Sequence, residues 1–177
     1  HLHHLGPCFI YTHWTNGTTG NAYANQGLRI GVATNGIAEL RQQENFNMNF
    51  FTNNTQRVSI TADGALLYNS TTGATPASGA GTRMMWIPDK AAFRAGQLDA
   101  FAATQWDNAN IGINSIAMGW NTEASGTRSA ALGGNSHATG NQSMSLGHII
   151  AAANPNSFII GTGIPNGSAT PNFINNI

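Results

Sequence analysis

Charged residues are scarce in this 177-residue chain, and their scarcity excludes several classes of partner. Only 8% of residues are charged, and seven Lys and Arg balance seven Asp and Glu. Nucleic acids and acidic lipid surfaces require a net basic face, so neither is an expected partner. The composition also differs from that of a disordered chain, because 41% of residues are apolar and the net charge is zero.

Cysteine and long apolar runs are lacking too. Cys8 is the only cysteine, so no internal disulfide can form, and packing or assembly must stabilise the chain. No apolar run is long enough to span a bilayer, and the start at His1 shows no signal-peptide pattern. We expect the mature or trimmed part of a longer protein, with any anchor or targeting signal outside it.

Motifs for catalysis or cofactor binding are missing. Lys90 is the only lysine and follows no phosphate-binding loop, and no Gly-x-Ser-x-Gly motif presents a nucleophile. The seven carboxylates are scattered, with no recurring pair beside a base. We therefore predict that the protein is not an enzyme and binds no cofactor. An enzyme-bearing tailspike, the alternative, would need a carboxylate pair in a cleft between chains.

The six histidines do not form a metal-ligand set within one chain. Three of them crowd the first four residues, and His13 is isolated. His137 and His148 fall at different positions of the repeat described next, so neither stacks on a second histidine. We predict no metal site. The alternative is that one of these two meets its own copies on a trimer axis, where three imidazoles can bind a metal.

A strict repeat of 14 residues occupies the C-terminal third of a chain rich in turn residues, with 22 Asn and 21 Gly. Each copy begins with Ser and ends with Gly four residues later. One coil of two short strands fits this spacing, because a five-residue strand spans roughly 16 Å and leaves about four residues for each corner. The predicted corner glycines are Gly119, Gly133, Gly147 and Gly161 on one side, and Gly126 and Gly140 on the other.

Bulky residues alternate with small ones inside each repeat strand, which places the bulky ones on a common face. We predict that this face fills the interior of the roll. Its members are Ile116, Met118, Leu132, Met144, Leu146, Phe158 and Ile160. The small residues Ala117, Ala131 and Ser145 then face outward, where an identical chain could approach closely.

The repeat resembles the YadA-like head repeats of trimeric autotransporter adhesins, whose 14-residue coil has the pattern Ser-x-Ala-x-Gly. The resemblance covers about residues 113–164 and implies a left-handed β-roll in which three chains pack side by side as a homotrimer. Two features depart from the pattern. Ile159 replaces the small residue, and Pro155 follows a lost corner glycine, so we expect the roll to end there.

The preceding part reads as short strands separated by turns, with Asn35-Gly36 and Asp63-Gly64 as hairpin signals. Over about residues 27–112 it resembles a module of phage tail fibres and of long surface proteins of Bacteroidetes-type bacteria. The resemblance implies architecture and context, not chemistry. We divide the chain into a β-strand module (1–69), a Gly/Ser/Thr/Pro linker (70–82), a connecting segment with a degenerate coil (83–112), the β-roll (113–164) and a tail (165–177).

Trp106 and Trp120 are 14 residues apart, and we predict that they share a column along one edge of the roll. Exposed aromatic ladders bind sugar faces, whereas buried ones pack between chains, and we favour packing. The sequence thus predicts an elongated all-β homotrimer, an extracellular structural or adhesive fibre component that displays or spaces a binding surface on a bacterial cell. The alternative is a phage or injection-system tail fibre, on a virion tail, that recognises a host-surface glycan or protein.

Overall fold

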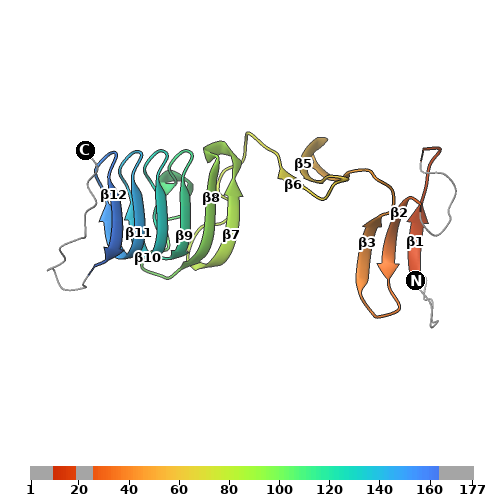
Figure 1. Ribbon diagram of the computed structural model, residues 1–177, viewed down its shortest axis with the longest axis horizontal. Coiled ribbons are helices and arrows are strands. Elements are labelled where there is room, and N and C mark those ends of the chain that lie inside the picture. Colours follow the sequence, from red (N-terminus) through yellow and green to blue (C-terminus); the bar gives the residue numbers. More distant parts are fainter. Residues whose placement is uncertain (1–9, 19–25, 164–177) are drawn as a thin grey trace. The chain divides into compact units, whose positions relative to one another are not determined.

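The computed structural model describes residues 10–18 and 26–163. Apart from two 3-10 turns at Pro88–Lys90 and Asn108–Asn110, the regular secondary structure of these residues consists of β-strands joined by turns and loops, which confirms the all-β prediction. Within the same ranges no helix has the length and apolar character needed to cross a membrane. The chain divides into two compact units, residues 1–69 and residues 70–177 (Figure 1).

Unit 1 contains two three-stranded antiparallel sheets. The first consists of β1 (Ile10–Trp14), β2 (Leu28–Val32) and β3 (Ala38–Gln42), and the second of β4 (Met48–Thr52), β5 (Thr55–Ile60) and β6 (Leu66–Tyr68). Both predicted hairpin signals form turns. The amide of Gly36 donates to the carbonyl of Ala33, and the amide of Gly64 donates to that of Thr61, each at 2.9 Å.

Unit 2 is built on one six-stranded sheet, whose strands lie side by side in Figure 1. Its strands are β7 (Gly81–Ile87), β8 (Ala92–Leu98), β9 (Ile116–Trp120), β10 (Ala130–Ala138), β11 (Met144–Ala152) and β12 (Phe158–Thr162). Strands β7 and β8 are antiparallel, and β8 to β12 are parallel. From β9 onward, paired residues are one repeat apart, which confirms a β-solenoid with coils of about 14 residues.

Small residues line the interior of this roll, contrary to the predicted register. Ala117, Ala131 and Ser145 pair across β9, β10 and β11 and are completely buried. The hydroxyl of Ser136 donates to the backbone carbonyl of Ser145 at 2.9 Å and lies 2.8 Å from its hydroxyl. Because these two serines come from different walls and touch directly, the space between the walls is narrow.

The bulky residues predicted to fill the interior lie on the outside, so that prediction was wrong. Five of them are between 36% and 44% exposed, namely Ile116, Met118, Leu146, Phe158 and Ile160, while Leu132 and Met144 are half-buried. Alternation shows which residues share a face but not which face is inside. The narrow space admits Ala and Ser, and this steric limit turns the larger side chains outward.

Each coil bends at a glycine that no other residue could replace without strain. At Gly133 the φ angle is +119°, and a Cβ there would lie 1.9 Å from the carbonyl oxygen of Gly147 in the next coil. Both the angle and the close approach require glycine. Gly119, Gly147 and Gly161 also have positive φ angles. Gly126 and Gly140 lie at the other corner of the coil, where a Cβ would lie about 2 Å from a carbonyl oxygen of the next coil.

The serine column that opens each repeat has a structural role as well. Each hydroxyl donates to the backbone carbonyl three residues earlier, at 2.6 to 2.7 Å. The column consists of Ser115, Ser129, Ser143 and Ser157. These bonds satisfy carbonyl oxygens at the corner, where no amide of a neighbouring strand donates to them in a ladder.

The corrected register predicts opposite outcomes for the same substitution at two adjacent alanines. Ala131→Leu should destabilise unit 2 by about 2 kcal/mol or more, because the closed interior has no room for three extra carbons. Ala130→Leu is the matched control, since Ala130 lies on the outer face between Ile116 and Met144. Thermal unfolding followed by circular dichroism checks this, and a larger loss for Ala130→Leu would show that the register is inverted.

Candidate functional site

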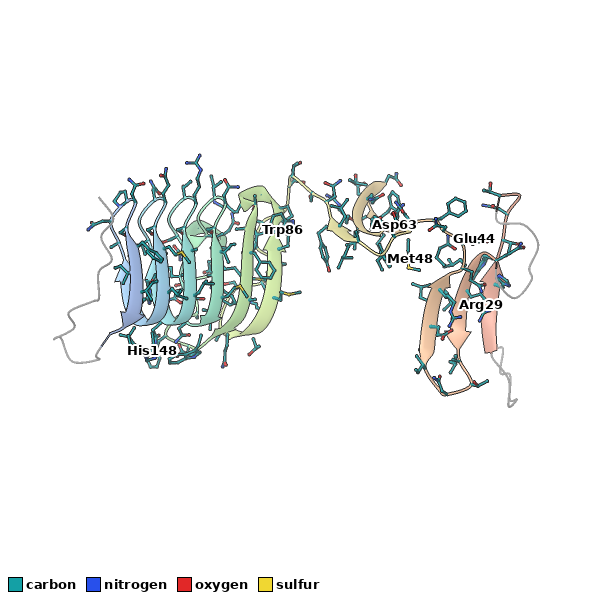
Figure 2. All side chains as sticks on the ribbon, viewed as in Figure 1. Arg29, Glu44, Met48, Asp63, Trp86 and His148 are labelled. Atoms are coloured by element: carbon teal, nitrogen blue, oxygen red, sulfur yellow. The ribbon has the colours of Figure 1, made fainter. Side chains whose placement is uncertain are left out.

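The six-stranded sheet carries one continuous outer face, which we define by three columns of paired residues. Strand pairing runs each column across the sheet from β7 to β12. The first column is Trp86, Phe93, Ile116, Ala130, Met144 and Phe158; the second is Met84, Ala95, Met118, Leu132, Leu146 and Ile160; the third is Thr82, Gln97, Trp120, Gly134, His148 and Thr162. Figure 2 shows the side chains that project from this sheet, with Trp86 and His148 labelled.

The outer face contains no Asp, Glu, Lys or Arg. His148 is its one titratable side chain, and large apolar side chains from four of the six strands, β7, β9, β11 and β12, are exposed on it. Isolated apolar residues are normal on protein surfaces, but a contiguous apolar patch marks an interaction site. Covering such a surface contributes roughly 25 cal/mol for each Å² removed from water. The face is therefore the strongest candidate for a functional surface in unit 2.

A notch occurs in the third column, where glycine separates two aromatic side chains. A Cβ at Gly134 would lie 2.8 Å from the ring of His148 and 3.8 Å from the indole of Trp120. Both rings therefore extend over the glycine from the strands on either side. Of the two tryptophans predicted as candidate contacts, Trp120 lies on the outer face and is 43% exposed.

Trp106 is completely buried, so the predicted shared column with Trp120 was wrong. Its indole Nε1 donates to the backbone carbonyl of Thr122 at 2.8 Å, and the guanidinium of Arg83 lies 5.5 Å from the centre of its ring. The 14-residue spacing between paired residues does not extend to β8, because β8 and β9 pair residues that are 23 positions apart. Packing is the role of Trp106 in this chain, and direct contact with a glycan is excluded.

Arg94 is a charged residue that could bind an anion, and its burial could not be predicted from the sequence. It pairs with Ala117 at the start of the interior column and is completely buried. Its Nη atoms donate to the hydroxyl of Ser115 at 2.8 Å and to the carbonyl of Ala124 at 2.9 Å, and also to two further carbonyls. Burial lowers the pKa of Arg94 to about 10, so the side chain stays charged at neutral pH. It fills and closes one end of the roll rather than offering an anion site.

Glu123 and His137 link two neighbouring coils on the wall opposite the outer face. Glu123 Oε2 lies 3.1 Å from His137 Nδ1, and its other oxygen accepts a hydrogen bond from Ser125 at 2.8 Å. The hydrogen bond with His137 is the main cause of a lowered pKa at Glu123. His137 therefore lies on this opposite wall. Of the two candidate axial histidines, His148 is the one that lies on the outer face.

Comparison with known families identifies the repeat. The model of the YadA head domain repeat matches two copies, at residues 111–136 and 124–148. This part of the chain therefore contains YadA-like head repeats. Such heads belong to adhesins that are exposed at cell surfaces, are non-enzymatic in kind and in general form homotrimers. No curated protein and no solved structure matches the chain, and the resemblance of residues 27–112 to tail-fibre modules stays a prediction.

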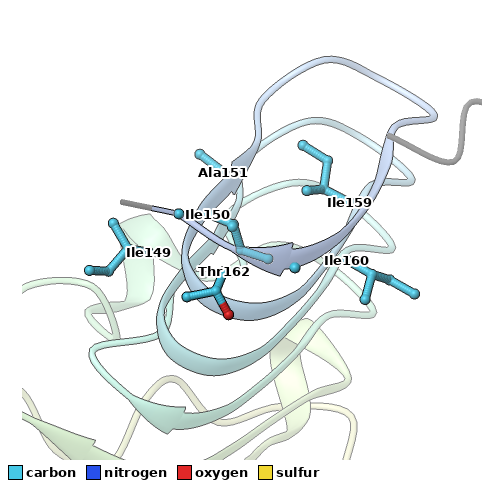
Figure 3. Close-up of a pocket in the computed structure, with 8 residues that line it drawn as sticks. Ile149, Ile150, Ala151, Ile159, Ile160 and Thr162 are labelled. Atoms are coloured by element: carbon cyan, nitrogen blue, oxygen red, sulfur yellow. The ribbon is translucent and has the colours of Figure 1, made fainter. Parts of the chain in front are cut away.

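The described head repeats end in an apolar cavity of about 160 Å³ (Figure 3). It lies between Ile149–Ala151 and Ile159–Gly163, with Ile150 and Ile159 on opposite walls. These two residues take the interior places held by Ser136 and Ser145 in the preceding coil. No titratable side chain lines the cavity, so it is the hollow above the last described coil and offers no groups for catalysis.

Metal-binding groups do not gather around the head repeats. No cluster of three or more His, Cys, Asp or Glu side chains occurs among residues 10–18 and 26–163. The three histidines at the start of the sequence, Cys8 and the predicted tail at 165–177 lie outside the described residues.

The Glu123 link predicts a pH-dependent contribution to the stability of the head repeats. A carboxyl whose pKa is lowered by folding stabilises the protein above its unfolded pKa, near 4.5, and loses that contribution as the pH falls through the folded value. Glu123→Gln should therefore lower the melting temperature at pH 7 by about 1–2 °C, since a partly exposed pair contributes little. At pH 3 the difference between the variant and the original protein should be smaller than at pH 7, because the carboxyl group becomes protonated as the pH falls.

Differential scanning calorimetry at both pH values measures this effect. Glu39→Gln in unit 1 is the control, because Glu39 pairs with the exposed Arg41 and lies outside the head repeats. A difference that is undiminished or larger at pH 3 would contradict the assigned link.

Proposed function

We propose that the protein is a non-enzymatic adhesive head component that works as a homotrimer, with the outer face at the threefold contact. The observation that supports this is the outer face itself, which is apolar, uncharged and continuous across six strands. A surface of this kind is costly in water, and three identical copies around an axis cover it without any other partner.

The trimer also gives a role to Trp120 and the third column. Trp120 lies at the end of β9, where the outer face meets the corner of the coil. We assign it to packing between chains at the rim of the contact, because an indole provides apolar area together with one hydrogen-bond donor. His148 then meets its own copies or a neighbouring Trp120 in the same region.

Covering the outer face leaves the opposite wall and the corners for ligands. That surface carries the polar and charged groups of the head repeats, including Glu123, His137 and the exposed Arg128. We propose that it recognises a host-surface glycan or protein at the bacterial cell surface. Three copies of a weak site raise the overall affinity through effective concentration. The family match favours the cell surface over a virion tail, because it is the adhesin repeats that match.

The proposed trimer predicts that a charge on the outer face prevents assembly. Leu146→Asp should convert a trimer into a monomer at micromolar concentration, because an unpaired carboxylate in an apolar contact is severely unfavourable. Arg128→Asp is the control, since Arg128 lies exposed at a corner with φ +57°, a conformation that Asp tolerates. Light scattering measures the mass, and circular dichroism verifies that β-structure is retained.

A monomeric original protein, or a Leu146→Asp variant that stays trimeric, would contradict the proposed contact. Adhesion is tested separately by displaying the chain on bacteria that do not attach, and by counting attachment to panels of glycans and matrix proteins. The original chain should attach, and the Leu146→Asp variant should attach much less because it has lost multivalency. Failure of the original chain to attach to any surface would count against the adhesive role but not against the trimer.

A further inference from the structure

Unit 1 folds into two sheets but buries almost nothing. Among residues 26–69 only Gly27, Arg29 and Ser59 are buried, and none of these has a large apolar side chain. A three-stranded sheet becomes stable when one face is covered, since the strand hydrogen bonds alone do not offset the loss of conformational entropy. Something must therefore cover these sheets in the folded protein.

The first sheet has one apolar and one polar face. Strand pairing places Trp14 beside Leu28, Ile30 beside Leu40, and Val32 beside Ala38 on one face. That face contains no charged side chain, and its large residues are 36% to 50% exposed. The charged and titratable side chains of the three strands share the opposite face, which consists in part of His13, Arg29, Glu39 and Arg41.

The second sheet also has an apolar face, although its opposite face is mixed and includes the exposed Leu67. Its apolar face has two rows, each with one residue from every strand: Met48, Ile60 and Leu66 in one row, and Phe50, Val58 and Tyr68 in the other. No charged residue lies on it either. On the opposite face the hydroxyl of Ser59 donates to the side chain of Asn49 at 2.6 Å. Two separate sheets of one chain thus each present a complete, uncharged apolar face.

We propose that these two faces pack against the same faces of two further copies of this chain, so that unit 1 folds only within the homotrimer. The inference rests on the proposed homotrimer and extends it to a part of the chain that the family match does not reach. Three copies held together through unit 2 bring three identical unit 1 chains to a high effective concentration. Uncharged apolar faces are self-complementary around a threefold axis, because no like charges oppose each other there.

The order of events favours the chain's own copies over a host protein as the occupant. A sheet without a covered face is unstable from the moment the chain is made, before any host surface is met. Copies of the chain are present at that stage. A face reserved for a host partner would leave both sheets without a core until binding.

Disulfide trapping tests the proposal on each sheet, in a Cys8→Ser background that removes the native thiol. Ile30→Cys and Ile60→Cys place a thiol on the two apolar faces, near the same residue of a neighbouring copy. Mild oxidation should give chains cross-linked in pairs on a non-reducing denaturing gel. Yields should reach at most about two-thirds of the chains, because three thiols on an axis can form one disulfide.

The matched controls place a thiol on the opposite face of each sheet. Arg41→Cys in the first sheet and Leu67→Cys in the second are exposed there, and they should cross-link at least about five-fold less than their counterparts. Equal yields from the two faces of a sheet would overturn the proposal. Met118→Cys on the outer face of unit 2 reports the proposed homotrimer independently.

The combination of outcomes separates the two proposals. Cross-linking at Met118→Cys without cross-linking at Ile30→Cys and Ile60→Cys would overturn the inference while leaving the homotrimer intact. Failure at all three positions would overturn the homotrimer itself. Limited proteolysis adds a second readout, because unit 1 should lose its protection in the monomeric Leu146→Asp variant. If unit 1 stays protected in that monomer, its two sheets cover each other within one chain and the proposal is wrong.

Discussion

The narrow space inside each 14-residue coil is the constraint on which the rest of unit 2 depends. Two walls that lie close enough for Ser136 to bond directly to Ser145 leave room for a methyl or hydroxyl group but not for a branched side chain. Ala and Ser therefore fill the interior, and the apolar residues that would form the core of an ordinary domain are turned outward. The stacked coils thus pair their backbone hydrogen-bonding groups with one another, but they leave their large apolar side chains exposed to water.

In the proposed homotrimer, this division couples folding to assembly. A single chain gains stability from the ladder of stacked strands and the serine bonds at the corners, while most of its large apolar side chains stay in contact with water. In the proposed homotrimer, association supplies the burial that a globular protein obtains within one chain, so the melting temperature is expected to depend on concentration. The two antiparallel sheets of unit 1 likewise pair their backbone groups but leave large apolar side chains exposed to water. The same physical reason for assembly therefore applies to both units.

Sequence patterns predicted the spacing but not the direction of the side chains. The 14-residue period, the corner glycines and the turns at Asn35-Gly36 and Asp63-Gly64 follow from local steric rules that short stretches of sequence carry. The choice between inside and outside depends on the distance between two walls, which is a tertiary property. The strict column of Ala and Ser was the available signal, since an interior that tolerated bulk would have varied in size.

The two described ends of the interior column carry large residues in place of the small ones. The column reads Arg94, Ala117, Ala131, Ser145 and Ile159, so the small residue is replaced by a large one at both ends. Arg94 satisfies carbonyls of the first coil with its guanidinium, and Ile159 with Ile150 covers the last described coil with apolar bulk. A roll made only of identical coils would leave open ends, to which other coils could add. Large residues in the same column that demands small ones elsewhere therefore cover both ends of the described coils, and they do so by the steric rule that builds the roll.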